Sequence, residues 1–159
     1  KIAAELYIKS YNKLYDVNSA ILRYGIPYGP RGRDGTVITN FIKRAIKKEP
    51  LIITGDGNQY RNFIYVEDLA EGNVAALKET GNNVYNLEGM RPVTIKEVAE
   101  TLSRMFEGVQ IEYRESRAGD FKGRMASNRK AYEELNWRPT TDLEEGLKKT
   151  IEWFKHARS

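Results

Sequence analysis

The stretch Gly55-Asp56-Gly57-Asn58-Gln59-Tyr60-Arg61-Asn62-Phe63-Ile64-Tyr65-Val66-Glu67-Asp68 decides the fold. Its Gly-Asp-Gly-Asn turn separates the apolar run Leu51-Ile52-Ile53 from the apolar run Phe63-Ile64-Tyr65-Val66. Short apolar runs bounded by turn residues predict two strands, and the pattern of residues 67–78 predicts a helix directly after them. A strand, a turn, a second strand and a helix in this order are typical of an α/β protein.

The flanking sequence continues the same alternation. Thr94-Ile95-Lys96-Glu97 is a capping box, in which the threonine oxygen accepts from a free amide and the glutamate returns to the cap, so it predicts a helix start. The density of Gly and Pro in residues 25–35 predicts a loop without regular structure. We expect helices at 1–14, 36–48, 67–78, 94–106, 129–135 and 142–156, and strands at 19–24 (buried), 51–53, 63–66, 84–87 and 109–114 (half-buried).

Composition and charge exclude several classes of protein. Apolar residues make up 40% and charged residues 30% of the 159, which is the composition of a globular domain rather than of a disordered chain. The chain has no cysteine and one histidine, His156, so disulfides, thiolate chemistry and multi-histidine metal sites are excluded and no metal is expected. The net charge of +4 favours an anionic ligand but is too small to demand nucleic acid. No apolar run approaches the roughly 18 residues of a membrane helix, so no membrane span is expected.

The segment Gly29-Pro30-Arg31-Gly32-Arg33-Asp34-Gly35 imitates a dinucleotide-binding motif. It has the spacing G-x-x-G-x-x-G between an expected strand and an expected helix, and the acidic Asp56 lies beyond the next strand. The first turn of such a helix must offer free amides to a diphosphate, whereas Pro30 has none and its neighbours are bulky and charged. We therefore interpret this segment as a surface loop rich in turn residues.

Three segments combine arginine with glycine or turn residues: 23–30, 55–68 and 117–120. The first follows an expected strand, and ligands of open α/β sheets bind at the carboxyl ends of strands. The planar fork of arginine suits phosphate oxygens, so arginines from two distant segments would suit a diphosphate. Asp120 could accept hydrogen bonds from ribose or sugar hydroxyls. The alternative is that these arginines only pair with nearby surface carboxylates.

Five motifs follow one another along nearly the whole chain. They are Lys1-Ile2-Ala3-Ala4-Glu5, residues 23–31, residues 55–68, Arg117-Ala118-Gly119-Asp120, and Leu135-Asn136-Trp137-Arg138-Pro139 followed by Leu143-Glu144-Glu145-Gly146-Leu147. In this order they resemble the end of the Tyr-x-x-x-Lys helix, R-Y-F-N-x-Y-G-P-R, G-D-G-x-Q-x-R-D-F-I-Y-V-x-D-L, R-x-G-D, and L-G-W-x-P with L-x-E-G-L. These are segments of the NAD-dependent nucleotide-sugar epimerase/dehydratase family, the extended short-chain dehydrogenases/reductases that include UDP-glucose 4-epimerase-like enzymes.

The resemblance implies an α/β fold that forms the C-terminal part of an extended Rossmann-type epimerase/dehydratase. Residues 1–35 would be a remnant of the NAD-binding Rossmann domain, with the catalytic-lysine helix, one strand and a loop. Residues 36–159 would be mainly the small α/β substrate-binding domain, with about 62–80 returning to the Rossmann domain. The chain starts at Lys1 with a helical pattern and no N-cap, so we expect it to begin inside a larger protein whose N-terminal half carries the cofactor glycines.

The resemblance also implies a role for particular residues. Lys1 would hydrogen-bond the nicotinamide ribose and lower the pKa of the catalytic tyrosine, which would precede Lys1 and is absent from this sequence. Tyr24 and Pro27 would lie beside the nicotinamide, while the missing half would bind most of the NAD. The nucleotide sugar would be held by Thr39 and Asn40 near the diphosphate or base, Arg61 and Arg117 on the diphosphate, Phe63 near the nucleotide, and Asp120 on the ribose hydroxyls.

The sequence departs from the family pattern at a few positions. Gly25 and Ile26 replace the Phe-Asn of R-Y-F-N, Asn62 replaces the Asp that follows the arginine, and Ser127 replaces an Asp before a short helix. The Asn of R-Y-F-N usually contacts substrate in this family, so the apolar Ile26 changes the pocket near the diphosphate or the sugar.

The leading hypothesis is a fragment of an NAD-dependent 4-epimerase that acts on a nucleotide sugar, with a UDP-sugar expected as the partner. Hydride would pass from sugar C4 to NAD and return to the opposite face. A 4,6-dehydratase or decarboxylase on the same scaffold is one alternative, because the residues that distinguish these enzymes precede Lys1. A non-catalytic nucleotide- or RNA-binding relative is another, which the basic run 43–48 permits, although such a run is also typical of a solvated helix face. We expect the intact protein to be a cytoplasmic homodimer and this chain alone to be inactive.

Overall fold

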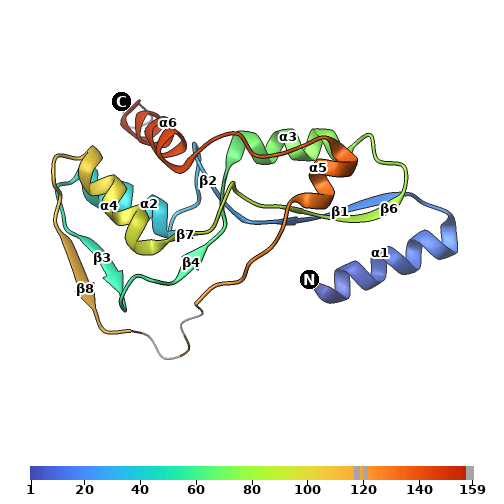
Figure 1. Ribbon diagram of the computed structural model, residues 1–159, viewed down its shortest axis with the longest axis horizontal. Helices are drawn as coiled ribbons and strands as arrows, with labels where there is room; N and C mark the ends of the chain where they lie inside the picture. The colour runs from blue at the N-terminus through green and yellow to red at the C-terminus, as the bar shows by residue number, and fades with distance from the viewer. Residues whose placement is uncertain (117–118, 120–121, 157–159) are drawn as a thin grey trace.

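The computed structural model of the chain is a mixed α/β structure, described for residues 1–116, 119 and 122–156 (Figure 1). This confirms the expected fold class. In chain order the elements are α1 (Ile2–Tyr15), β1 (Ser19–Tyr24), β2 (Ile26–Tyr28), α2 (Val37–Ile46), β3 (Leu51–Thr54), β4 (Tyr60–Arg61), β5 (Phe63–Tyr65), α3 (Val66–Ala76), β6 (Asn82–Leu87), β7 (Val93–Thr94), α4 (Ile95–Met105), β8 (Ile111–Arg114), α5 (Arg129–Leu135) and α6 (Leu143–His156).

The strands form pairs that change partner along the chain. β1 runs parallel to β6, and Figure 1 shows this pair between α1 on one side and α3 and α5 on the other. β2 runs parallel to β5, β3 runs parallel to β8, and β4 runs antiparallel to β7. The switch from β1 to β2 takes place at Gly25, whose N–H donates to the oxygen of Leu87 at 2.9 Å, while the next N–H, of Ile26, donates to Asn62 at 2.7 Å.

The larger hydrophobic core lies between α2, α4, α6 and strands β2, β3 and β5. Ile42, Leu102 and Leu147, one from each helix, are fully buried in it. Tyr28 packs edge-on against Phe63, with ring centroids 6.3 Å apart. The predicted buried face of the last helix is confirmed, because its members Leu147, Ile151 and Phe154 all belong to this core.

A smaller core joins β1, β6, α3 and α5. Tyr85, Leu87 and Trp137 are buried there, and Gly72 of α3 faces them so closely that a Cβ on it would lie 2.8 Å from Leu87 Cδ1. Residues of β6 and α5, both of which lie beyond residue 80, therefore share a core with β1. The division of the chain into two domains at residue 35 stays a prediction.

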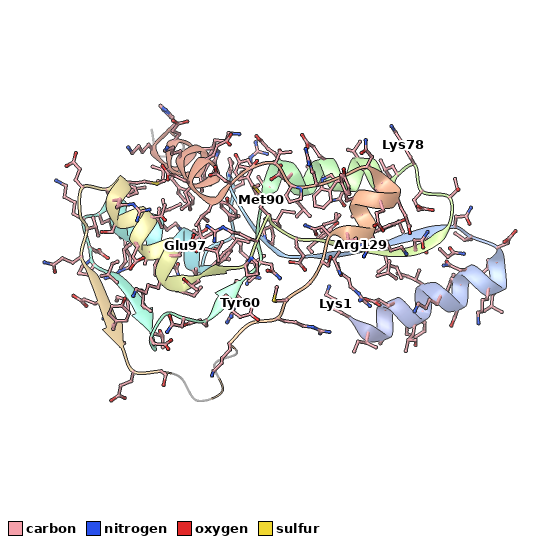
Figure 2. The ribbon with its side chains drawn as sticks, viewed as in Figure 1. Lys1, Tyr60, Lys78, Met90, Glu97 and Arg129 are labelled. Atoms are coloured by element: carbon pink, nitrogen blue, oxygen red, sulfur yellow. The ribbon has the colours of Figure 1, made fainter. Side chains whose placement is uncertain are left out.

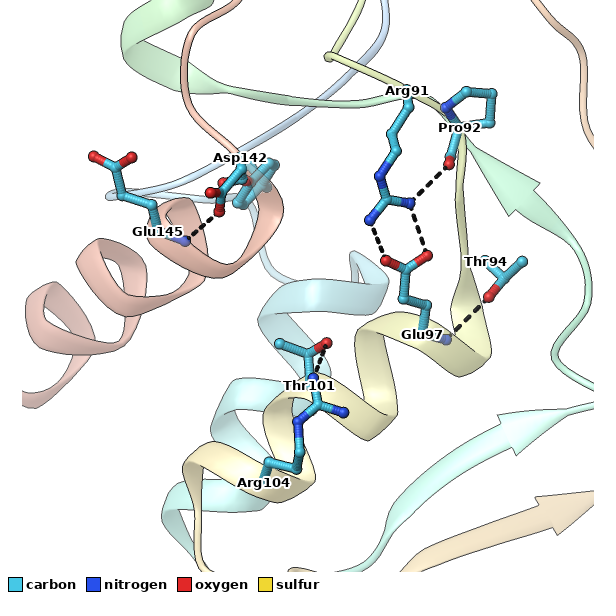
Figure 3. Close-up of polar contacts among 9 residues, drawn as sticks. Arg91, Pro92, Thr94, Glu97, Thr101, Arg104, Asp142 and Glu145 are labelled. Carbon is cyan, nitrogen blue, oxygen red and sulfur yellow. Dashed lines mark hydrogen bonds and ion pairs between the residues drawn. The ribbon is translucent and has the colours of Figure 1, made fainter.

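Helix starts follow the predicted capping chemistry. Thr94 Oγ1 accepts from the Glu97 amide at 3.0 Å, and Asp142 Oδ1 accepts from the Glu145 amide at 2.8 Å at the start of α6 (Figure 3). The Glu97 carboxylate is held by Arg91, and the Thr94 amide also lowers its pKa, as the capping box requires. The predicted range 129–135 of α5 is confirmed to the residue.

The structure corrects two of the expected elements and adds two strands that the sequence did not predict. Residues 25–35 are not loop throughout, because Ile26–Tyr28 forms β2. This strand pairs with β5 along its whole length, with Pro27 opposite Ile64, and Tyr28 is buried. β1 is half-exposed rather than buried, since in the described part of the chain it pairs with β6 alone. The two-residue strands β4 and β7 are too short to leave a periodic pattern in the sequence.

Candidate functional site

A cleft of about 810 Å³ opens between α2 and the strands β2 to β5. One wall is the face of α2 that carries Asn40 and Lys43, together with the loop before it. The opposite wall contains Ile52 and Thr54 of β3 and the segment that runs from Gln59 through β4 to β5. The cleft is large enough for a ligand the size of a nucleotide sugar.

The structure brings three of the predicted substrate residues into this cleft. Asn40, Arg61 and Phe63 all line it, although they come from α2, β4 and β5. The guanidinium of Arg61 donates to the main-chain oxygen of Tyr60 at 2.8 Å, which fixes part of its direction. Thr39 is placed differently: its side chain is buried, and its Oγ1 accepts from Thr36 Oγ1 at 3.0 Å inside the start of α2. Arg117 and Asp120 lie outside the described residues.

Positive charge gathers along the α2 wall. Four cations line the cleft in addition to Arg61, and the carboxylate that lines it among the described residues is that of Glu49; the four are Arg33, Lys43, Arg44 and Lys47. Lys43 pairs with Asp34, and Arg44 pairs with Glu49 at 3.3 Å. The basic run 43–48 is visible in the sequence, but only the fold shows that three of its cations face a cavity instead of open solvent.

The predicted cofactor residues lie at the carboxyl edge of the β1–β6 pair. Figure 2 shows Lys1 at the end of α1 that is nearer the middle of the molecule. The Glu5 carboxylate accepts from the Arg23 guanidinium at 2.8 and 2.6 Å, which ties the first turn of α1 to the end of β1 and lowers the pKa of Glu5. Tyr24 is half-exposed and donates its hydroxyl to Asn73 Oδ1 at 2.5 Å, and Pro27 is exposed in β2.

A buried carboxylate that no sequence motif marks lies at the same edge. Glu88 follows β6 directly and is only 9% exposed. A Cβ on Gly25 would lie 2.6 Å from Glu88 Oε2, so the carboxylate occupies the space that a side chain at position 25 would need. Burial raises the pKa of Glu88, and a hydrogen bond from the Asn62 side chain opposes that rise. Two bonds with Asn128, at 2.8 and 2.9 Å, hold its main chain.

A second cavity of about 210 Å³ lies on the other side of Phe63, which lines both. Its polar edge is formed by Arg91 and Asp142, and its floor is formed by Tyr28 and Val93. Figure 3 shows the guanidinium of Arg91 in a two-pronged pair with the Glu97 carboxylate, with 2.9 Å for the Nη1 contact. The cation of this cavity is therefore already neutralised.

Two further classes of site are tested by the structure. The described residues contain no group of three or more His, Asp or Glu side chains that could hold a metal ion. None of the helices in the described part of the chain has the length and hydrophobicity needed to cross a bilayer.

Comparison with known proteins identifies the relatives of this fold. A family model described as "NAD dependent epimerase/dehydratase family" matches residues 1–87, more than half of the chain. The chain belongs to the NAD-dependent epimerase/dehydratase family. The resemblance inferred from the sequence motifs is confirmed by this match.

Curated relatives in this family cover the chain almost completely. A UDP-glucuronate 4-epimerase of Thermodesulfobacterium geofontis is 39% identical over 98% of the chain, and a putative UDP-glucose 4-epimerase of Methanocaldococcus jannaschii is 38% identical over 98%. The chain spans about half the length of these relatives, 49% and 52%.

Solved structures of family members share the fold. The UDP-glucose 4-epimerase of Thermotoga maritima, solved with UDP-glucose, has a TM-score of 0.93 at 31% identity and is matched over 100% of this chain and 53% of its own. The UDP-glucuronic acid 4-epimerase of Bacillus cereus, in complex with UDP-glucuronic acid and NAD, has a TM-score of 0.89 at 31% identity, over 99% of this chain and 51% of its own. The fold described here thus corresponds to about half of each of these solved structures.

Proposed function

We propose that this chain is the nucleotide-sugar-binding half of an NAD-dependent 4-epimerase that acts on a UDP-sugar. The observation that carries the proposal is that Asn40 of α2 meets Arg61 and Phe63 of the motif 55–68 on one basic cleft. Relatives named as 4-epimerases of UDP-glucuronate and UDP-glucose support the same activity.

The cleft suits a nucleotide diphosphate chemically. Arg61 offers the planar fork that binds phosphate oxygens, and the cations on α2 raise the potential along the opposite wall. Phe41 and Phe63 provide apolar surface for the nucleoside. We assign Arg117 to the diphosphate and Asp120 to the ribose hydroxyls from the R-x-G-D motif, and Thr39 to the support of Asn40 at the start of α2.

The carboxyl edge of β1 fits the nicotinamide end of NAD. It combines the ammonium of Lys1, brought there by the Glu5–Arg23 pair, with the exposed rings of Tyr24 and Pro27. Bound NAD would supply reversible hydride transfer at sugar C4. Lys1 would hold the nicotinamide ribose and lower the pKa of a tyrosine that precedes it in the Tyr-x-x-x-Lys motif, so that the phenolate can take the proton of the C4 hydroxyl. We assign most of the NAD contacts to the part of the protein that this chain does not include.

The test measures the affinity of the natural polypeptide that contains this chain for UDP-glucose and UDP-glucuronate by calorimetry. Replacement of both Arg61 and Arg117 by Ala is expected to weaken binding roughly 100-fold, because each removes charge-assisted hydrogen bonds to phosphate. Arg129→Ala is the matched control, since that guanidinium is exposed and pairs with Glu133 on the same helix. Unchanged affinity in the double variant would refute the proposed site.

Repeating the binding measurements over a range of salt concentrations, with RNA as a second ligand, separates a nucleic-acid-binding relative from an enzyme. RNA binding should weaken steeply with salt, whereas a nucleotide sugar held in a preformed cleft should respond far less. Conversion of UDP-glucose to UDP-galactose by the intact protein is the direct readout of 4-epimerase activity.

A decarboxylase is the second candidate, because a UDP-glucuronic acid decarboxylase of Arabidopsis thaliana is 35% identical over 98% of the chain and 37% of its own length. The products decide between the two: a decarboxylase releases CO₂ from UDP-glucuronate, and a 4-epimerase conserves the carboxylate.

We also propose a cytoplasmic homodimer in which α1 packs against its copy. None of the α1 residues is buried in this chain, and the exposed fractions of Ile2, Leu6 and Leu14 are 78%, 59% and 72%. Such an apolar face is typical of an interface. Light scattering of the intact protein should give twice the chain mass, and Leu6→Glu should shift it towards the monomer.

A further inference from the structure

A short segment of the chain runs along β4 on its way to α5. The Tyr60 amide donates to the oxygen of Lys122 at 2.8 Å, and the side-chain amide of Asn62 donates to the oxygen of Arg124 at 3.1 Å. Figure 2 shows Tyr60 beside this part of the chain. The segment therefore holds both neighbours of Arg61, one through its main chain and the other through its side chain.

Gly123, the middle residue of the segment 122–124, lies directly against Tyr60. Its φ of +136° is a backbone conformation that glycine adopts and other residues rarely do. A Cβ at this position would lie 2.7 Å from two carbons of the Tyr60 ring and 2.7 Å from the main-chain oxygen of Tyr60. The ring can turn away, but the oxygen belongs to β4, which is paired with β7 on its other edge. Glycine is therefore the residue that lets the segment lie this close to the strand.

The same main-chain oxygen anchors the side chain of Arg61. The Arg61 guanidinium donates to the oxygen of Tyr60 at 2.8 Å. The N–H and C=O of one strand residue point to the same side, so the Tyr60 oxygen points towards the segment 122–124, as its N–H does. The atom that fixes part of the direction of Arg61 is thus the atom that Gly123 lies against.

The direction of Arg61 matters for the ligand that we assign to it. A two-pronged contact with phosphate oxygens depends on the plane of the guanidinium. Arg61 lines the cleft, and an arginine side chain has many rotamers to lose when it becomes fixed. A bond to the main chain restricts those rotamers before the ligand arrives, so less entropy is lost on binding.

We propose that the segment 122–124 positions Arg61 for the diphosphate and that Gly123 is the residue on which this positioning depends. The inference rests on the proposed function, in which Arg61 binds the diphosphate. Gly123 acts through Arg61 and not through a contact with the ligand, because it keeps the Tyr60 oxygen available to the guanidinium. A side chain at position 123 pushes that oxygen away and weakens the anchor of Arg61.

The loss of Arg61 itself sets the upper limit of the effect. Arg61→Ala alone is expected to weaken UDP binding roughly tenfold, because it removes charge-assisted hydrogen bonds to phosphate. Gly123→Ala keeps the guanidinium but disturbs its placement, so we expect a loss of roughly fivefold. Asn62→Ala removes the bond to Arg124 without adding an atom, and we expect a loss of roughly threefold.

The test measures the affinity of the natural polypeptide for UDP by calorimetry, with each variant alone and combined with Arg61→Ala. The matched control is Gly108→Ala, because Gly108 also has a positive φ, +85°, but a Cβ there would meet nothing within 4 Å. This control should bind UDP within about twofold of the wild type. In the Arg61→Ala background, Gly123→Ala and Asn62→Ala should each change the affinity by less than about twofold, since no guanidinium is left to position.

Two results would overturn the inference: a folded Gly123→Ala variant that binds UDP as tightly as the wild type, or a loss of affinity that persists undiminished in the Arg61→Ala background. Circular dichroism shows whether Gly123→Ala folds, and if it does not, Asn62→Ala decides by the same two criteria. The single variant Arg61→Ala keeps this separate from the proposed function. If it binds UDP like the wild type, the proposed site fails as well; if it binds more weakly and Gly123→Ala does not, only the role of the segment fails.

Discussion

Replacement of Asp68 should test whether one buried carboxylate fastens the C-terminal segment to the rest of the molecule. Asp68 lies at the start of α3 and is 2% exposed. Its carboxylate accepts from the Thr140 amide at 3.2 Å, the Thr140 hydroxyl at 3.0 Å and the Thr141 amide at 3.0 Å. Its main-chain oxygen accepts from Trp137 Nε1 at 3.0 Å. Four bonds thus join α3 to the segment that leads into α6.

The structure gives the order of the effects. Asp68→Ala removes the acceptor of three hydrogen bonds. A hydrogen bond to a charged acceptor contributes about 1 kcal/mol or more to the free energy of unfolding. Thr140 lies at the surface, where water replaces part of what is lost, so we expect a loss of about 2–4 kcal/mol in the free energy of unfolding. Asp68→Asn keeps one oxygen but turns an NH₂ group towards an amide, which should cost about 1–2 kcal/mol.

The free energy of unfolding is measured by urea titration, followed by the fluorescence of Trp137 and Trp153 and by circular dichroism. Glu67→Gln is the matched control, because the Glu67 carboxylate is exposed and loses only a 3.9 Å contact with Lys149. Its free energy of unfolding should stay within about 0.5 kcal/mol of the wild-type value. A double-mutant cycle between Asp68→Ala and Thr140→Ala should show a coupling of at least about 0.5 kcal/mol. An Asn variant as stable as the wild type, or as damaged as the Ala variant, would refute the reasoning.

Three more outcomes follow from close contacts and shifted pKa values. Gly89→Ala should prevent folding or lower the free energy of unfolding by more than about 3 kcal/mol, because the new Cβ would overlap a main-chain oxygen. Gly35→Ala meets open space and should lower it by only about 1 kcal/mol, because of the positive φ at that position. Soluble yield and urea midpoints compare the two variants. Arg91 lowers the pKa of Glu97, so this pair stabilises the fold above about pH 4.5 and loses its effect as the pH falls through the lowered value. Because both side chains are partly exposed, Arg91→Ala should lower the free energy of unfolding by no more than about 0.5 kcal/mol at pH 7 and should leave it unchanged at pH 3. Burial raises the pKa of Glu88, so the wild type loses stability as the pH rises from about 4.5 through the raised value and the carboxyl ionises. The stability of Glu88→Gln relative to the wild type should therefore rise between pH 4 and pH 7. A stability difference that does not change with pH would contradict this.

The sequence predicted the helices of this fold well because their signals are local. Thr94 and Asp142 cap α4 and α6 with their own side chains, and the apolar spacing of α6 repeats over about three turns. β2 was missed for the opposite reason. Its three residues contain a proline, and they form a strand only because β5, more than thirty residues away, supplies the partner. Long-range pairing of this kind overrides local propensity.

The candidate site was predictable where a motif carried it and hidden where packing created it. Arg61 and Phe63 belong to the motif 55–68, Asn40 was expected from the resemblance to the family, and the structure places all three on one cleft. No sequence pattern marks Glu88, because its contacts are with Gly25 and Asn62. These residues are distant from Glu88 in the sequence, and the pairing of the strands brings them close to it. Nor did the pattern show that the hydroxyl of Thr39 is engaged within α2.

The strand β5 explains why a single stretch decides the fold and also shapes the site. Phe63 and Tyr65 point into the larger core while Ile64, between them, points into the smaller one. All three are buried, as alternation predicts for a strand covered on both faces. A slip of one residue would exchange the two cores, so the register of β5 is fixed by both at once. Since Phe63 also lines the cleft and Asn62 reaches Glu88, the same register sets the distance between the diphosphate residues and the cofactor edge.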